Sequence, residues 1–260
     1  MPDLRIEIIG LDLPLVRSGD DLPLLIERAA ERLGGIRDGD ILVVSSKVVS
    51  ISEGRLVDLS AVRPGKRAKE LSRATRQPPE FVEVVLEEAD EVVNAVRGAL
   101  LTIKNGHLTA NAGADLSNSP HGHAVLWPRD PMGSAERIMR SFGGRSIGVI
   151  IADSAVRPLR LGTVGQAIGW AGIAPVADCR GKPDLYGRPL RMTWRAIADQ
   201  IATAAELVTG EGSERRPVVI VRGLEISERR GGPSPVIPRN RCLFFGKYAR
   251  RGRGKRKHQR

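Results

Sequence analysis

Three acidic segments of the sequence carry side chains that could bind a metal ion. They are N-A-G-A-D-L-S-N at residues 111–118, I-A-D-S at 151–154 and T-G-E-G at 209–212. Hard cations such as Mg²⁺ and Mn²⁺ prefer oxygen ligands, and nucleotide sites combine one or two carboxylates with phosphate oxygens. The carboxylates of Asp115, Asp153 and Glu211 are therefore candidates for one metal-assisted site. The alternative is that each acid only stabilises a turn or caps a helix, and spacing alone leaves both interpretations open.

A second polar group follows an apolar run at Ser45, Ser46 and Lys47. Backbone N–H groups, hydroxyls and an ammonium group could cradle phosphates there without a Walker motif, although a plain solvated strand end would look the same. Arg157 and Arg160 come shortly after Asp153, and we expect them to hold a substrate phosphate or carboxylate. Arginine is far commoner than lysine in this sequence, so either arginine could equally be a surface residue.

Several well-known catalytic motifs are missing from the sequence. It has no G-x-x-x-x-G-K-[ST] phosphate loop, no G-x-S-x-G elbow and no H-E-x-x-H zinc motif. His121 and His123 have no third ligand at suitable spacing, which favours a surface loop. Two cysteines, Cys179 and Cys242, are too few for a disulfide framework.

The length suits one large domain or two small ones, and the charge separates a nearly neutral body from a basic tail. The chain has 260 residues, of which 41% are hydrophobic and 27% charged, which suits a globular fold with a real core. The net charge is +11, and twelve lysines and arginines without any acid lie in residues 229–260, so residues 1–228 carry −1. We therefore predict a folded domain at 1–228 and a disordered basic tail at 229–260.

The distribution of apolar residues predicts a cytoplasmic protein that does not enter a membrane. The longest apolar run, at residues 147–152, is far shorter than the roughly 18 residues that a spanning helix needs. The first ten residues have an early acid and no long apolar core, unlike a secretory signal.

Strand-like and helix-like patterns alternate along the body. The predicted strands are residues 4–9, 41–50, 146–152 and 217–222, with a hairpin at 100–109 that turns at Asn105-Gly106. The predicted helices begin after Asp21, at Pro78-Pro79, after the cap residue Ser134 and at Thr193. The pattern therefore indicates a body of mixed strands and helices, with the acidic segments at strand and helix ends.

Eight segments in one order resemble the coenzyme F-420-0:L-glutamate ligase family, the CofE-type gamma-glutamyl ligases. They are DLPLV at 12–16, VVSSKVVSISEGR at 43–55, ANAGADLSN at 110–118, DSAVRPLRLG at 153–162, AIGWAGI at 167–173, DCRGKPDLYGRPL at 178–190, AAELVTGE at 204–211 and PVVIVRG at 217–223. No single segment is decisive, but their shared order is specific. The resemblance covers about residues 3–224.

The resemblance implies an α+β fold of two interlocked mixed α/β subdomains, a homodimer, and a GTP-dependent ligase. Such an enzyme joins the carboxylate of F-420-0 to the amine of L-glutamate through an acyl phosphate, and some members extend the gamma-glutamyl tail. Mg²⁺ or Mn²⁺, two ions in number, are the implied cofactors, with K⁺ as a further candidate. Carried over by position, the implied metal ligands are Asp115, Asp153, Ser154 and Glu211. The implied GTP contacts are Leu13, Pro14, Leu15, Val16, Ser46, Lys47, Asn118, Thr209, Gly210, Glu211 and Gly212.

The sequence departs from this family pattern at three positions. Ile51 stands where the family often has a second lysine, which removes one phosphate contact. Val156 replaces a glycine and Leu159 a tryptophan in the segment after Asp153, so we expect a different loop shape near the substrate.

Two other functions remain open at this point. One is a ligase of the same family that acts on another acid acceptor. The other is a nucleic-acid-binding protein that uses the basic tail, where Phe244, Phe245 and Tyr248 lie near basic residues. A passive, solvated tail is the alternative to that second function.

Overall fold

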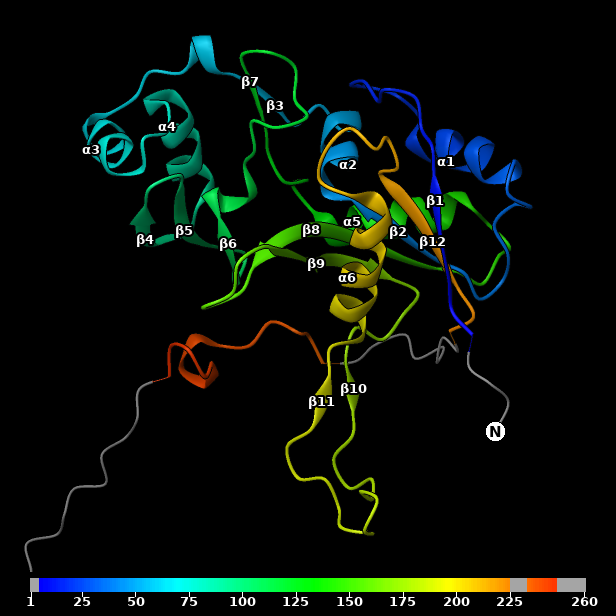
Figure 1. Ribbon diagram of the computed structural model, residues 1–260. Coiled ribbons are helices and arrows are strands. Elements are labelled where there is room, and N and C mark those ends of the chain that lie inside the picture. The colour runs from blue at the N-terminus through cyan, green and yellow to red at the C-terminus, as the bar shows by residue number, and fades with distance from the viewer. Residues whose placement is uncertain (1–4, 225–232, 247–260) are drawn as a thin grey trace, which may run out of the picture.

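A five-stranded mixed sheet forms the centre of the computed structural model, which describes residues 5–224 and 233–246 (Figure 1). The strand order is β1-β12-β2-β8-β9, in which β2 and β8 are parallel and the other pairs are antiparallel. The strands are β1 (Glu7–Leu11), β12 (Val218–Arg222), β2 (Ile41–Ser45), β8 (Gly148–Val156) and β9 (Thr163–Ala171). The parallel pair places Ser45, at the end of β2, opposite Ala152 of β8.

Helices cover both faces of this sheet. Helices α1 (Leu22–Glu31), α2 (Ser46–Ser52) and α5 (Pro131–Ser141) pack on one face, and α6 (Ile197–Thr209) packs on the other. Successive residues of β2 show the two faces: Leu42 belongs to the core under α1 and α5, and Val43 to the core under α6. A strand buried on both faces needs apolar residues at consecutive positions, which explains the continuous apolar runs.

A second subdomain is inserted between β2 and β8 in the chain. It contains α3 (Lys66–Thr75), α4 (Pro79–Glu88) and the antiparallel sheet β4-β5-β6, at Glu91–Val96, Ala99–Lys104 and His107–Ala110. The pair β3 (Leu56–Asp58) and β7 (His123–Val125) and the short 3-10 helices Leu59–Ala61 and Asn111–Gly113 complete it. The main sheet thus continues on both sides of the insertion, which confirms an α+β fold of two interlocked subdomains.

A narrow arm, formed by residues 172–196 between β9 and α6, extends from the main sheet. Figure 1 shows it pointing away from the body, with β10 (Ala177–Asp178) paired to β11 (Trp194–Arg195) at its base. Leu185, Tyr186 and Met192 lie beyond this pair and are largely exposed.

Part of the predicted tail contacts the body. In residues 233–246, the 3-10 helix Arg239–Arg241 places the Arg239 guanidinium 2.6 Å from a carboxylate oxygen of Glu91. The predicted disorder of the tail stays a prediction for residues 229–232 and 247–260, which lie outside the described residues. Within residues 5–224 and 233–246, every helix is too short or too polar to cross a lipid bilayer.

Three element predictions are wrong in their boundaries. The strand predicted at 41–50 ends at Ser45, and the β-branched residues after it form α2, because Val49 and Ile51 pack into the core from a helix. The helix predicted from Ser134 begins at Pro131, where the Asp130 side chain accepts a hydrogen bond from Gly133 N. The helix predicted from Thr193 begins at Ile197, because residues 194–195 pair with β10.

The other element predictions agree more closely with the structure. The hairpin turns at Asn105-Gly106, and the first helix has Asp21 as its N-cap. Strands β1 and β12 appear at nearly the predicted positions, with β1 shifted by two to three residues, and β8 continues to Val156. Strong apolar patterns and cap residues are local signals, so they could be interpreted without knowledge of the tertiary fold.

Candidate active site

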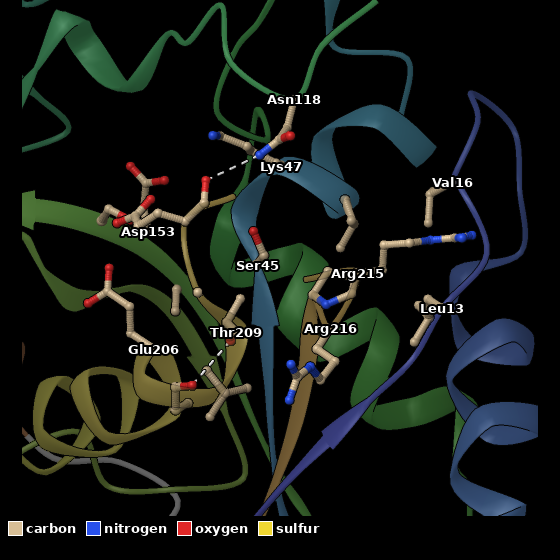
Figure 2. Close-up of a pocket in the computed structure, with 18 of the residues that line it drawn as sticks. Leu13, Val16, Ser45, Lys47, Asn118, Asp153, Glu206, Thr209, Arg215 and Arg216 are labelled. Carbon is tan, nitrogen blue, oxygen red and sulfur yellow. Dashed lines mark hydrogen bonds between the residues drawn. The ribbon is translucent and has the colours of Figure 1, made fainter. Parts of the chain in front are cut away.

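A cavity of about 570 Å³ opens beside the end of β2 and the middle of β8, and six separate segments of the chain line it. These segments are the loop at residues 13–16, the end of β2 with α2, the region around Asn118, residues 152–154 of β8, Gly165 of β9 and the stretch from α6 to residue 217. Figure 2 shows Asp153 and Glu206 on one side, Leu13 and Val16 on the other, and Arg215 and Arg216 between them. The volume suits a small-molecule substrate or nucleotide.

Asp153 lies at the acidic side of this cavity, on β8. Its Oδ1 accepts a hydrogen bond from Ser46 Oγ at 2.7 Å, and its Oδ2 accepts one from Trp127 Nε1 at 2.7 Å. Burial raises the pKa of Asp153, and the two hydrogen bonds and the charge of Lys47 oppose this rise. The carboxyl group is thus fixed in orientation by partners from two different elements.

Lys47 connects the cavity to the segment that carries Asp115. Its Nζ lies 2.6 Å from Asp115 Oδ2 and donates a hydrogen bond to Ser117 Oγ at 2.9 Å. Burial raises the pKa of Asp115, but Lys47 and Ser117 outweigh burial and leave the pKa below its usual value. Asp115 is therefore ionised at neutral pH and forms an ion pair with Lys47, which also lines the cavity.

The turn after α6 supplies Glu211. Its Oε1 accepts hydrogen bonds from Ser154 Oγ and Thr163 Oγ1, both at 2.7 Å. Asn118 Nδ2 donates to the carbonyl oxygen of Gly212 at 3.1 Å, which ties the turn to the second subdomain. Gly210 adopts a φ of 68°, a left-handed conformation that glycine accepts easily, and this lets the chain leave the helix toward the cavity.

The opposite side of the cavity is apolar and basic. Leu13 N donates to the carbonyl oxygen of Arg215 at 3.1 Å, so the first loop and the last segment form one wall. Leu13, Val16 and Ile51 are buried in this region, and Arg215 and Arg216 line it. Such a wall could hold a flat apolar base, with cations available for its phosphates.

The structure brings nearly all of the predicted site residues together. Lining the cavity are Leu13, Pro14, Leu15, Val16, Lys47, Asn118, Asp153, Ser154, Thr209, Gly210, Glu211 and Gly212. Ser46 and Asp115 join them through hydrogen bonds to Asp153 and Lys47. Arg157 and Arg160 lie in the turn between β8 and β9, outside the lining, so their contact with a substrate stays a prediction.

Glu206 is a site residue that sequence reasoning missed. It lines the cavity from the last turn of α6, and within the described residues its buried Oε1 has no hydrogen-bond partner. Burial and the neighbouring carboxyl group of Glu211 raise the pKa of Glu206 to about 7. In the sequence, Glu206 is only an acid beside the apolar stripe of a long helix. Such acids are too common for the pattern to indicate a site residue.

The oxygen-bearing side chains in the cavity fit divalent cations that are bound by protein and phosphate oxygens together. The carboxyl groups of Glu206 and Glu211 interact with each other, and burial together with the charge of Asp115 raises the pKa of Asp153. Among the described residues, no three Asp, Glu, His or Cys side chains form a complete cage. Asp115, Asp153, Ser154 and Glu211 could therefore supply part of the coordination of Mg²⁺ or Mn²⁺, with waters or the oxygens of a ligand completing it, as is usual for Mg²⁺ at nucleotide sites.

The fold and cavity define an α+β protein with a site suited to a phosphorylated ligand and divalent cations. The family described as F420-0:Gamma-glutamyl ligase matches residues 10–223, nearly the whole folded body. The chain belongs to this family.

Relatives from several archaea support this assignment. Proteins named coenzyme F420:L-glutamate ligase are 40% identical in Methanothermobacter thermautotrophicus, over 94% of this chain and 100% of the relative, and 43% identical in Methanopyrus kandleri, over 90% and 92%. The corresponding protein of Archaeoglobus fulgidus is 42% identical over 86% of this chain and 90% of its own length.

Proposed function

We propose that this protein is a GTP-dependent ligase that joins the carboxylate of F-420-0 to the amine of L-glutamate. The observation that carries this proposal is the convergence of Asp115, Asp153 and Glu211 around one cavity, together with Lys47. These residues lie far apart in the sequence, and a cation–triphosphate complex needs this combination of carboxylates and ammonium group. The family membership and the names of the relatives supply the acceptor and the amino acid.

The reaction has to activate a carboxylate, which is a poor acyl donor. In the proposed first step, an acceptor carboxylate oxygen attacks the γ-phosphorus of GTP, the bond to the β-phosphate oxygen breaks, and GDP leaves. In the second step, the glutamate amine attacks the carbonyl carbon of the acyl phosphate, and phosphate leaves with the C–O bond electrons. The amine loses its proton to solvent or buffer, and the product is an amide. Positioning and charge neutralisation dominate such chemistry, so no activated serine or cysteine is required.

The two sides of the cavity suit two parts of GTP. The apolar wall around Leu13 and Val16 suits the guanosine, and Lys47, Asn118 and the backbone of residues 209–212 suit the phosphates. Asp115, Asp153, Ser154 and Glu211 would hold Mg²⁺ or Mn²⁺, which neutralises charge on phosphate oxygens during transfer. The proposal also includes K⁺ as a further cofactor and the addition of more than one glutamate to the gamma-glutamyl tail.

The exposed arm supports the further proposal of a homodimer. Leu185, Tyr186 and Met192 are each more than four-fifths exposed to solvent. Clustered exposed apolar side chains mark interaction surfaces, and most oligomers of soluble proteins are symmetric copies of one chain. The arm would therefore contact a second copy of this chain.

A screen of nucleotides, acceptors and metals tests the ligase proposal. The protein is incubated with L-glutamate, GTP or ATP, Mg²⁺ or Mn²⁺, and F-420-0 or another carboxylic acid, and the products are weighed by mass spectrometry. We expect F-420-0 to gain one or more glutamyl units with GTP and a divalent cation. Formation of the product without any nucleotide would contradict the mechanism, and a product with another acid alone would contradict the acceptor.

The variant Asp153→Asn, measured in the same screen, tests whether the Asp153 carboxylate binds the metal. We expect the variant to fold normally and to lose the product, because the amide side chain removes a charge that the cation needs. Asp90→Asn, at an exposed carboxylate of the second subdomain, is the matched control and should keep the wild-type rate. A wild-type rate in Asp153→Asn would exclude this carboxylate as a metal ligand.

A further inference from the structure

The indole ring of Trp127 connects the second subdomain to the buried carboxyl group of Asp153. Trp127 is only 2% exposed, and its Nε1 donates a hydrogen bond to Asp153 Oδ2 at 2.7 Å. A buried tryptophan usually finds a hydrogen-bond partner for its N–H. Here the single polar atom of the side chain points at a carboxylate of the cavity.

The ring is held in place from its other sides. The His107 ring meets it edge-on with the ring centres 5.8 Å apart, and Lys104 Nζ lies 5.9 Å from its centroid. The Trp127 carbonyl oxygen accepts a hydrogen bond from Arg55 Nε at 3.1 Å. These contacts fix both the backbone and the plane of the indole, so its N–H has one available direction.

An ion cluster of Glu88, Arg55 and Lys104 stabilises two of these contacts. Both carboxylate oxygens of Glu88 accept hydrogen bonds from Arg55 at 3.0 Å, and Lys104 also bonds to Glu88. Burial raises the pKa of Glu88, but Lys104 and Arg55 outweigh burial and hold it below its usual value. The cluster thus stays ionised at neutral pH, and it anchors the two cationic side chains that contact Trp127.

The acidic segment around Asp115 also makes room for the indole. Gly113 has a φ of 72°, and a Cβ at this position would overlap Trp127 Nε1. The same segment therefore supplies Asp115 and leaves the space through which Trp127 reaches Asp153. A side chain at position 113 would have to displace the indole N–H from the carboxylate.

We propose that Trp127 is a positioning residue that orients the Asp153 carboxylate for binding a divalent cation. The inference rests on the proposed function, because it assumes that Asp153 is a metal ligand. A hydrogen bond to one oxygen of a ligating carboxylate limits its rotation and leaves the remaining lone pairs directed toward the cavity. Loss of such outer contacts typically weakens metal binding about 10- to 100-fold.

The test measures Mn²⁺ binding directly, by electron paramagnetic resonance of the free ion, with the metal alone as the probe. Trp127→Phe keeps most of the ring and removes the N–H, so we expect its Kd for Mn²⁺ to rise about 10- to 100-fold. The melting temperature is measured on the same samples. Trp170→Phe, on the neighbouring strand β9, is the matched control and should bind Mn²⁺ as the wild type does.

A second variant and a second signal extend this test, and the melting temperature is measured for each variant because alanine at a φ of 72° is strained in itself. Gly113→Ala should weaken Mn²⁺ binding in the same direction, and combining it with Trp127→Phe should add little further loss. In a Trp170→Phe/Trp194→Phe background, Trp127 is the remaining tryptophan, and Mn²⁺ should quench its emission.

Three results would overturn parts of the proposal. If the wild type binds Mn²⁺, Asp153→Asn does not, and Trp127→Phe binds it with unchanged Kd, the positioning role is wrong while the metal site stands. A lower melting temperature with an unchanged Kd also excludes the positioning role, since it shows a purely structural one. If the wild type and Asp153→Asn bind Mn²⁺ equally, the metal assignment itself fails.

Discussion

Lys47 Nζ and Asp115 Oδ2 lie 2.6 Å apart, although Lys47 belongs to α2 beside the main sheet and Asp115 follows the sheet of the second subdomain. This ion pair closes one side of the cavity. It also means that a phosphate and a carboxylate would compete for the same ammonium group. In the proposed enzyme, Lys47 would therefore move from Asp115 to a phosphate of the bound nucleotide.

Replacing Lys47 should weaken nucleotide binding. In Lys47→Ala, the phosphates lose a charged donor, and hydrogen bonds to charged groups contribute about 1.5–3 kcal/mol. We expect the KM for GTP to rise roughly 10- to 100-fold, which corresponds to that range. Steady-state kinetics at saturating F-420-0 and L-glutamate measures this, with Lys69→Ala on the exposed surface of α3 as the control. An unchanged KM would show that Lys47 only neutralises Asp115.

The raised pKa of Glu206 predicts a pH dependence of stability in the absence of divalent cations. Its pKa is about 7 in the folded protein and near 4.5 when exposed, so the folded state binds more protons between these values. This contribution to stability is fully present below pH 4.5 and is lost as the pH rises through 7. Glu206→Gln should lose less stability than the wild type between about pH 5 and pH 8, measured by urea unfolding.

Added Mg²⁺ or Mn²⁺ checks the origin of this effect. A cation near Glu206 and Glu211 would favour both ionised carboxylates, so it should reduce the difference between wild type and Glu206→Gln at about pH 8. Glu87→Gln, an exposed position on α4, should follow the wild type under all conditions. If the wild type and Glu206→Gln show parallel pH profiles, the carboxyl group does not titrate in this range.

The sequence predicted the acidic side of the cavity better than its surroundings. Asp153 and Ser46 follow apolar runs that favour buried strands, and the two strands lie side by side in the sheet. The position of Asp115 relative to Lys47, in contrast, follows from how the two subdomains meet, which no local pattern encodes. The metal-ligand roles came from the family resemblance, because an isolated acid in a turn looks like a cap.

The missed residues and boundaries have a common physical cause. Glu206 and Trp127 matter because of what lies opposite them in space, at Glu211 and Asp153. The start of α2 was assigned to a strand because its residues are β-branched, yet packing of Val49 against the core outweighs a weak local preference. Tertiary contacts decide such cases, and a single sequence does not display them.

The exposed arm predicts a concentration-dependent dimer. Tyr186→Asp combined with Leu185→Asp places two charges where the proposed partner surface would be apolar, so the dimer should dissociate. Sedimentation velocity at several protein concentrations measures this, and Leu33→Asp, at a partly exposed position just after α1, should sediment as the wild type does. A wild-type protein that stays monomeric at all concentrations would contradict the proposed assembly.

Close packing between β9 and α6 depends on the missing side chain at Gly165. A Cβ at this position would overlap backbone atoms of Ala202 and Thr203, so Gly165→Ala must push α6 away from the sheet. Overpacking of this kind typically costs about 1–3 kcal/mol, measured as the free energy of unfolding in urea.

The substitution should also affect the cavity, because Gly165 itself lines it and the displaced α6 carries Glu206 and ends at Thr209. We therefore expect Gly165→Ala to raise the KM for GTP in addition to lowering stability. Gly143→Ala is the matched control, since the nearest atom to its new Cβ would be 3.6 Å away, and its stability should change by less than about 0.5 kcal/mol. Equal stabilities for the two variants would show that α6 adjusts without cost, and the link between strand packing and the cavity would then be wrong.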